Sequence, residues 1–361
     1  MTDITVSSVD SPGTLQSLSP LRIVIPGGEG HLGRLLARRL SGQGHRVTTL
    51  ARTLRHSAGA AQSDASCGPK GWEITLWDGK SLGSWVEVLE HADVLINLAG
   101  RSVDCRYTPA NRAAILQSRV QSTAILAQAI ESLRCPPRLW LNASTATIYR
   151  HALDRDMDEA TGELGGNEPC APDSWRFSID VARQWERTFF APHTPHTRKV
   201  ALRSAMVMSI QPGGVFEVLL RLVRNRLGGK WGSGSQYMSW IHEEDFFRSV
   251  EFLIGQEHIA GAVNLAAPGP LPNEQFLARL RKAWGTSIGL PAAEWMLEIA
   301  AFFLRTETEL LLKSRRVVPG VLLDYGFEFS FPQWAEAASD LVWRWKGKVA
   351  TGAAGELARN Y

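Results

Sequence analysis

A glycine cluster between two apolar, β-rich segments constrains the fold of this chain more than any other feature. The run 21–25 (LRIVI) enters PGGEGHLG, a helix-compatible segment follows, and a second β-rich run covers 46–50. Gly27, Gly30 and Gly33 form GxxGxxG, a variant spacing of the glycine pattern that turns a chain from a strand into a helix. The order strand, glycine turn, helix, strand predicts the start of a parallel α/β sheet.

Each glycine has its own physical role in such a turn. Gly27 allows the tight bend, Gly30 lets the backbone approach a pyrophosphate, and Gly33 lets the helix pack on the strand. The first N–H groups of the helix then face the anion. The alternative is a glycine-rich turn that binds no ligand. The residues that we assign to dinucleotide binding here are Gly27, Gly28, Gly30, His31, Leu32 and Gly33.

The end of the second β-rich run indicates which dinucleotide is preferred. NAD-preferring sites usually place Asp or Glu there, about 20 residues after the glycines, to bind the ribose 2′-hydroxyl. This chain instead has Arg52, with Arg55 and His56 close behind. A guanidinium pairs with a 2′-phosphate, so the sequence favours NADP(H) over NAD(H). The alternative is that Arg52 is a solvated loop residue.

Charge and hydropathy exclude several classes of function. The 39 basic and 36 acidic residues are intermixed and leave a net charge of +3, which argues against nucleic-acid and membrane-surface partners. No run of about 18 apolar residues predicts a transmembrane helix. Residues 1–20 lack the basic and apolar regions of a secretory signal and are expected to form a flexible leader.

The four cysteines show neither CxxC spacing nor a metal-ligand pattern. We therefore expect no metal and a reduced cytoplasmic location. Separately, we expect a monomer or homodimer that acts on an unknown small molecule. These cysteines are Cys67, Cys105, Cys135 and Cys170.

Strand-like and helix-like segments alternate over the first two thirds of the chain. This alternation predicts an α/β fold with a doubly wound, Rossmann-type parallel sheet built from 21–210 and 240–266. The expected strands after the first two are 72–77, 94–98, 138–143, 199–207 and 262–266, and the expected helices are 112–132 and 177–190.

The pattern loosens after residue 208, where glycine pairs interrupt it. We predict a smaller, mostly helical C-terminal lobe from 211–239 and 267–345, followed by a loose tail at 346–361. Within this lobe, helices are expected at 271–285 and 292–312.

Hydroxyl side chains follow the strand 138–143, at the sheet edge where ligands bind in open α/β folds. In LNASTATIYR, Ser144 and Thr145 end the strand and Tyr149 lies four residues further on. These hydroxyls could hydrogen-bond a substrate oxygen beside a nicotinamide. The alternative is that the three residues only close a strand–helix turn.

Several segments together resemble one known family, the extended short-chain dehydrogenases/reductases of the NAD(P)-dependent epimerase/dehydratase superfamily. PGGEGHLG, NLAG and NASTATIY are similar to the glycine, fourth-strand and serine/threonine motifs of that family. RYTPANRAAILQSRVQST, GSGSQYMSWIHEEDF and RRVVPGVLLDYGFEFSFP resemble, more narrowly, the atypical "epimerase family protein" subgroup, whose C-terminal domain has no assigned function. The resemblance covers roughly 21–345.

The resemblance implies roles for further residues. Arg52 would meet the ribose phosphate, Asp78 would lie near the adenine, and Thr145 would take the position of the catalytic hydroxyl. The residues implied to line the cofactor are Leu98, Ala99, Gly100 and Arg119, the last replacing an expected asparagine. The residues assigned to the substrate pocket are Ser144, Arg203, Met238, Trp240 and His242.

The chain departs from the family at the catalytic helix. The resemblance implies YxxxK, in which the tyrosine exchanges a proton and the lysine lowers its pKa. The segment WRFSIDVARQWE has Phe177 and Ser178 near the tyrosine position, and Val181 and Ala182 near the lysine position. The arginine expected before the SWIH segment to bind a sugar diphosphate is also absent.

These departures leave two functions open. One is an NADP(H)-dependent epimerase or oxidoreductase in which Tyr149 donates the proton, with Arg119 as a nearby cation. The other is a non-catalytic NADPH-binding sensor or scaffold. His242 is the second titratable candidate, although it is also expected to have a structural role, because SWIHEED resembles a strand end that opens a helix.

Overall fold

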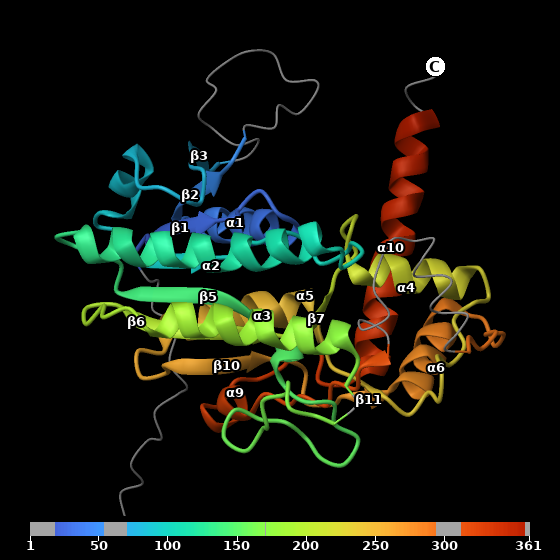
Figure 1. Ribbon diagram of the computed structural model, residues 1–361. Helices are drawn as coiled ribbons and strands as arrows, with labels where there is room; N and C mark the ends of the chain where they lie inside the picture. The colour runs from blue at the N-terminus through green and yellow to red at the C-terminus, as the bar shows by residue number, and fades with distance from the viewer. Residues whose placement is uncertain (1–18, 54–70, 170, 294–311, 358–361) are drawn as a thin grey trace, which may run out of the picture.

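The computed structural model describes residues 19–53, 71–169, 171–293 and 312–357 (Figure 1). In this part of the chain, no helix combines the length and the apolar character needed to cross a membrane. The sequence expectations that lie outside the described residues are the leader up to residue 18, Arg55, His56, Cys67, Cys170 and most of the helix 292–312.

The central sheet has seven strands that run parallel in the order β3-β2-β1-β4-β5-β6-β10. The strand order reverses between β1 and β4, so the crevice beyond their carboxyl ends is the place where open α/β sheets bind ligands. The predicted doubly wound fold is confirmed. The strands are β1 (Arg22–Pro26), β2 (Arg46–Ala51), β3 (Glu73–Leu76), β4 (Val94–Asn97), β5 (Leu139–Thr145), β6 (Arg198–Ser204) and β10 (Gly261–Leu265).

The two faces of the sheet pack against different helices, because successive side chains of a strand point to opposite faces. On β1, Ile23 and Ile25 pack with side chains of α1 and α5, whereas Val24 packs with side chains of α2 and α3. Figure 1 shows α2 and α3 in front of the strands. The helices that accompany the sheet are α1 (His31–Gly42), η1 (Ser84–Leu89), α2 (Pro109–Ser132), η2 (Ala146–Ile148), α3 (Asp173–Phe190), α5 (Glu243–Gly255) and α9 (Gly320–Asp324).

A second core forms the C-terminal lobe. It packs α4 (Val215–Arg224) and α6 (Asn273–Trp284) against α10 (Trp334–Leu357), and the rings of Phe276 and Trp334 stack at 4.0 Å. Short strands complete the lobe and its junction with the sheet: β8 (Tyr237–Met238) pairs with β11 (Leu271–Pro272), and β7 (Met206–Met208) pairs with β9 (Trp240–His242).

Two boundaries differ from the sequence expectations. The expected strand 199–207 is divided: β6 ends at Ser204, and β7 leaves the main sheet to pair with β9. The division occurs at Ala205, whose N–H donates to Leu265 at the end of β10. The expected loose tail is also corrected, because α10 continues to Leu357.

Substitution of Gly27 tests how strongly the stability of the fold depends on the glycine turn between β1 and α1. Its φ is +77°, and an added Cβ would lie 2.7 Å from the backbone of Leu98 and Ala99. Gly44 also has positive φ, +90°, but has open space around it. We expect Gly44→Ala to lower the free energy of unfolding by roughly 1–2 kcal/mol, the cost of left-handed backbone alone. Gly27→Ala should cost clearly more in chemical denaturation, and equal losses would contradict the close contact.

Candidate functional site

The glycine turn joins β1 to α1 at the point where the strand order reverses. Gly27 adopts positive φ, and its N–H donates to the carbonyl of Leu50 at the end of β2. A Cβ on Gly33 would lie 2.5 Å from the Gly27 carbonyl, so this position is restricted to glycine by packing. Gly30 has ordinary extended backbone, φ −74°, and a Cβ there would approach only the Gly27 carbonyl, at 3.2 Å. The absence of a side chain at Gly30 therefore leaves space beside the turn, but the backbone conformation there does not itself require glycine.

The turn after β4 lies directly against the glycine turn. The backbone of Leu98 and Ala99 contacts Gly27, and the Ala99 N–H donates to the Asn97 side chain. Asn97 in turn donates to Asn142 on β5, at 2.7 Å. The structure therefore brings the predicted cofactor segments 27–33 and 98–100 together at one edge of the sheet.

The N-terminus of α1 fits an anionic group. In this first turn there is no acidic residue, and Gly30 provides no side-chain cap for the N–H groups. Two buried polar atoms beside it, Glu29 Oε1 and His31 Nε2, have no hydrogen-bond partner among the described residues. The His31 ring lies next to Gly214, which caps α4. Unpaired N–H groups at this helix end, with His31 Nε2 beside them, suit a pyrophosphate, whereas the Glu29 carboxylate is an acceptor and does not contribute to binding an anion.

Arg52 and Asp78 lie at the same edge, at the ends of the neighbouring strands β2 and β3. Arg52 is exposed and follows β2 directly. The Asp78 carboxylate accepts hydrogen bonds from the N–H groups of Lys80 and Ser81 and from the Ser81 hydroxyl, which lower its pKa to about 2. Asp78 is thus ionised, and its hydrogen bonds stabilise the turn that follows β3.

Arg119 reaches this edge from α2. Its guanidinium donates to the carbonyls of Arg101 and Ile115, lies 5.1 Å from the Trp185 ring, and sits beside Gly100. Burial lowers the pKa of Arg119 to about 10, so the group remains a cation at neutral pH. In the described part of the chain no carboxylate forms an ion pair with it.

Tyr149 occupies a position that does not suit a proton donor. Its side chain is only 2% exposed, its hydroxyl donates to Asn264 at 2.9 Å, and the same oxygen accepts from Arg203 at 2.9 Å. Burial raises the pKa of the Tyr149 phenol. This geometry corrects the sequence hypothesis: Tyr149, which follows η2, connects that turn to β6 and β10.

Arg203 and Ser144 belong to the same interior network. Arg203 makes a bidentate ion pair with Glu186 of α3, with both N–O distances at 2.8 Å, and the Ser144 hydroxyl donates to Glu186 at 2.6 Å. A buried cation that is already paired and hydrogen-bonded has little capacity left for a ligand. The assignment of Arg203 and Ser144 to a substrate pocket is therefore not supported.

Thr145 remains half-buried at the carboxyl end of β5, where its hydroxyl accepts from the Thr147 N–H at 3.2 Å. Two cations of the C-terminal segment meet Thr147. Lys313 Nζ donates to its carbonyl at 2.7 Å, and Arg315 Nε donates to its hydroxyl at 3.2 Å. Sequence analysis missed Lys313 and Arg315, although the basic KSRR run was a signal that could have indicated them.

The other expected pocket residues lie inside the protein. Met238 and Trp240 are buried in the core of the C-terminal lobe. His242 is 1% exposed: its Nδ1 accepts from the Glu244 N–H as the cap of α5, and its Nε2 lies 3.1 Å from Asp340 of α10. This geometry favours the structural role of His242 over the titratable site.

A second tyrosine side chain, that of Tyr107, lies near α3, the helix at the position of the family's YxxxK motif. Tyr107 comes from the segment before α2, and its hydroxyl is 3.3 Å from the Ser178 hydroxyl on α3. The Tyr107 ring packs edge-on against Phe177, with centroids 5.0 Å apart. Sequence analysis did not single out Tyr107, because the two segments are about 70 residues apart and meet only through the packing of α2 on α3.

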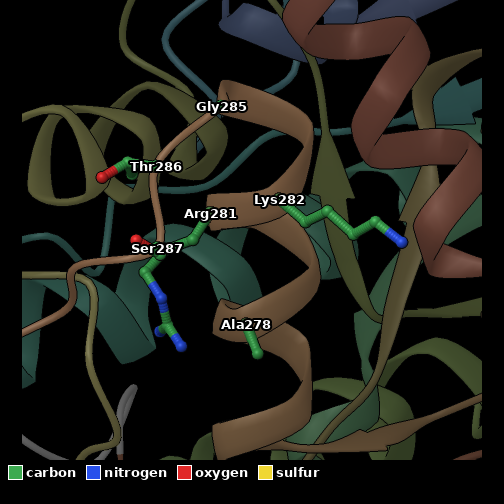
Figure 2. Close-up of a pocket in the computed structure, with 6 residues that line it drawn as sticks. All are labelled: Ala278, Arg281, Lys282, Gly285, Thr286 and Ser287. Atoms are coloured by element: carbon green, nitrogen blue, oxygen red, sulfur yellow. The ribbon is translucent and has the colours of Figure 1, made fainter.

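A surface hollow of about 330 Å³ lies elsewhere, at the C-terminal end of α6 (Figure 2). It is lined by Arg281, Gly285 and Thr286, among others. Figure 2 shows Arg281 and Lys282 pointing to different sides of the helix. Arg281 donates to the Gly228 carbonyl, which fixes a loop of the lobe. This hollow contains none of the predicted site residues, so we do not assign the function to it.

Comparison with known proteins identifies the glycine-turn domain. The model of the NAD dependent epimerase/dehydratase family matches residues 23–266, and a domain of unknown function (DUF1731) matches residues 292–341. The chain belongs to the NAD dependent epimerase/dehydratase family. The match of the family model coincides with the doubly wound sheet, and the second match begins within the C-terminal lobe.

Relatives of the whole chain belong to the same subgroup as the sequence resemblance. The chain is 28% identical to the human epimerase family protein SDR39U1, covering 89% of this chain and 100% of the relative. It is 29% identical to the epimerase family protein SA0724 of Staphylococcus aureus, covering 88% and 98%. A crystal structure of human SDR39U1 (isoform 2) with NADPH superimposes with a TM-score of 0.73 at 27% identity, over 89% of this chain and 99% of that one. The chain is thus an NAD(P)-binding protein of the short-chain dehydrogenase type.

The buried His242 makes stability depend on pH. Burial lowers the pKa of His242 in the folded state, whereas the unfolded chain has the ordinary value near 6.5. Below about pH 6.5 the unfolded state therefore binds more protons than the folded state, so the free energy of unfolding decreases as the pH falls. We expect the midpoint of thermal unfolding to fall between about pH 7 and pH 5, and to fall less in His242→Gln. Equal slopes in the two proteins would contradict this role.

Proposed function

We propose that this family member binds NADP(H) in preference to NAD(H). The glycine turn at the reversal of strand order supports binding of a dinucleotide, because its helix N-terminus suits the pyrophosphate that NADP(H) and NAD(H) share. Arg52 supports the preference, since it is exposed directly after β2, where NAD-preferring members have a carboxylate. The NADPH complex of human SDR39U1 also supports it.

Arg52→Ala tests the preference. The substitution should weaken NADPH binding about tenfold or more and leave NADH binding nearly unchanged, because only NADPH carries the 2′-phosphate. Quenching of intrinsic tryptophan fluorescence during titration measures both affinities. Arg38→Ala removes another exposed arginine from α1 and is the matched control. Equal affinities of the wild-type protein for NADPH and NADH would overturn the proposal.

The activity that we propose is hydride exchange with a small carbonyl or alcohol, as in an oxidoreductase or an epimerase. When bound, the nicotinamide supplies or accepts the hydride. The chain must then orient the substrate oxygen and move one proton. Thr145, half-buried at the carboxyl end of β5, is the hydroxyl best placed to orient that oxygen.

For the proton we propose Tyr107, in place of the buried Tyr149. The Tyr107 hydroxyl is hydrogen-bonded to Ser178 at the start of the catalytic helix. Arg119 lies near Tyr107, since coulombic attraction between the two raises the pKa of Arg119 against the larger effect of burial. A nearby cation favours the charged form of a phenol. A phenol beside an unpaired cation can give a proton to a carbonyl oxygen as the hydride reaches its carbon, and can recover that proton from water.

Tyr107→Phe tests this assignment, because it keeps the ring against Phe177 and removes only the hydroxyl. With phenanthrenequinone as the carbonyl probe, NADPH oxidation should slow about 10²–10⁴-fold, while NADPH affinity stays within a factor of two. Tyr325→Phe, which alters an exposed tyrosine of α9's C-terminus, should leave the rate unchanged. An unaltered rate in Tyr107→Phe would exclude Tyr107 as the donor.

The rival function is a non-catalytic NADPH sensor or scaffold. The observation that favours it is the interior position of Tyr149, together with the absence of a tyrosine at 177–178 and of a lysine at 181–182. Two results together would support this function. The protein would turn over no carbonyl compound or nucleotide sugar, and it would bind a protein partner only when loaded with NADPH. The cytoplasmic location and the monomeric or dimeric state stay predictions.

A further inference from the structure

Three metal-binding side chains meet at the edge of the sheet opposite the glycine turn. Glu90 and His91 lie between η1 and β4, and Cys135 lies between α2 and β5. Their ligand atoms, a carboxylate oxygen, an imidazole nitrogen and a thiol sulfur, all lie within 4.8 Å of one another. His91 and Cys135 are exposed, so a solvated ion has access to them.

Backbone hydrogen bonds hold the two loops together without any ligand. The His91 N–H donates to the Cys135 carbonyl at 3.0 Å. The Glu90 carboxylate accepts from the N–H of Cys135 at 2.7 Å and from the N–H of Arg134 at 3.4 Å. The parallel pairing of β4 with β5 places both loops at the same edge. An ion would therefore meet a set of ligands whose backbone is already ordered, which reduces the entropic cost of binding.

The chemistry of the donor set indicates which ion would bind. A thiolate and an imidazole are ligands for zinc and similar transition metals, whereas magnesium and calcium require oxygen ligands. Zinc holds such ligands at about 2.0–2.3 Å in tetrahedral geometry, which places them about 3.5 Å apart. Ligand atoms that lie up to 4.8 Å apart must therefore come about 1 Å closer together, and the exposed side chains of His91 and Cys135 are the ones that would move.

We propose that Glu90, His91 and Cys135 bind one zinc ion, with water in the fourth position. The Glu90 carboxylate has two oxygens that can accept in several directions, so it can ligate an ion while keeping its backbone hydrogen bonds. The bound ion links the loop before β4 to the loop before β5. Because it binds the folded state only, zinc raises the thermal stability of the protein. This inference is independent of the proposed function, since the site lies away from the cofactor edge.

Metal titration of the untagged full-length chain, stripped with a chelator, tests the proposal. With Co²⁺ as the spectroscopic probe, wild type should show a thiolate-to-metal charge-transfer band that saturates at one ion per chain. Competition with a chromophoric chelator then measures Zn²⁺ affinity. Cys135→Ser should abolish the band, and Cys135→Ser and His91→Gln should each weaken Zn²⁺ binding at least about tenfold.

Cys105→Ser is the matched control. Cys105 is also a free cysteine, and it lies at the opposite edge of the sheet, in the segment before α2. This variant should bind both ions like wild type. Zn²⁺ should raise the unfolding temperature of wild type and Cys105→Ser but not that of Cys135→Ser. Absence of the Co²⁺ band in wild type, or unchanged Zn²⁺ affinity in Cys135→Ser, would overturn the proposal. Thermal unfolding without metal verifies that each variant is folded.

Discussion

The close contact between Gly27 and the peptide that joins Leu98 to Ala99 is the constraint on which the predicted cofactor-binding edge of the sheet depends. It brings the turn after β1 against the turn after β4, where the strand order reverses. Only a residue without Cβ, at positive φ, allows this approach. The contact orders the N-terminus of α1 beside the β4 turn, so that one edge of the sheet can bind an extended dinucleotide.

The junction between the sheet and the C-terminal lobe depends on β9 and the helix that follows it. Trp240 packs in the lobe and Ile241 packs under the sheet, because alternate residues of a strand face opposite sides. His242 then caps α5 and contacts Asp340, and Arg344 pairs with Glu243. The same short segment thus belongs to both cores, which explains why its residues are interior rather than exposed to a ligand.

Polar side chains at the carboxyl end of β5 divide into two groups. In the interior, Ser144 donates to Glu186 of α3, and Tyr149 accepts from Arg203 of β6, which also pairs with Glu186, since a buried polar group without partners is costly. Thr147 instead contacts Lys313 and Arg315 of the C-terminal segment, and the half-buried Thr145 accepts from the Thr147 N–H. This division separates Ser144 and Tyr149, which stabilise the interior, from Thr145 and Thr147, although these four residues are close together in the sequence.

The sequence by itself determined the doubly wound sheet, the glycine turn and the existence of a second lobe, because strand and helix periodicity and glycine spacing are local patterns. Only the tertiary structure decided which polar residues are buried in the interior and which distant residues meet. The interior position of Tyr149, the contact of Tyr107 with Ser178, and the meeting of His91 with Cys135 all join segments far apart in the chain. Such contacts depend on how strands pair and helices pack, and local residue patterns contain no record of them.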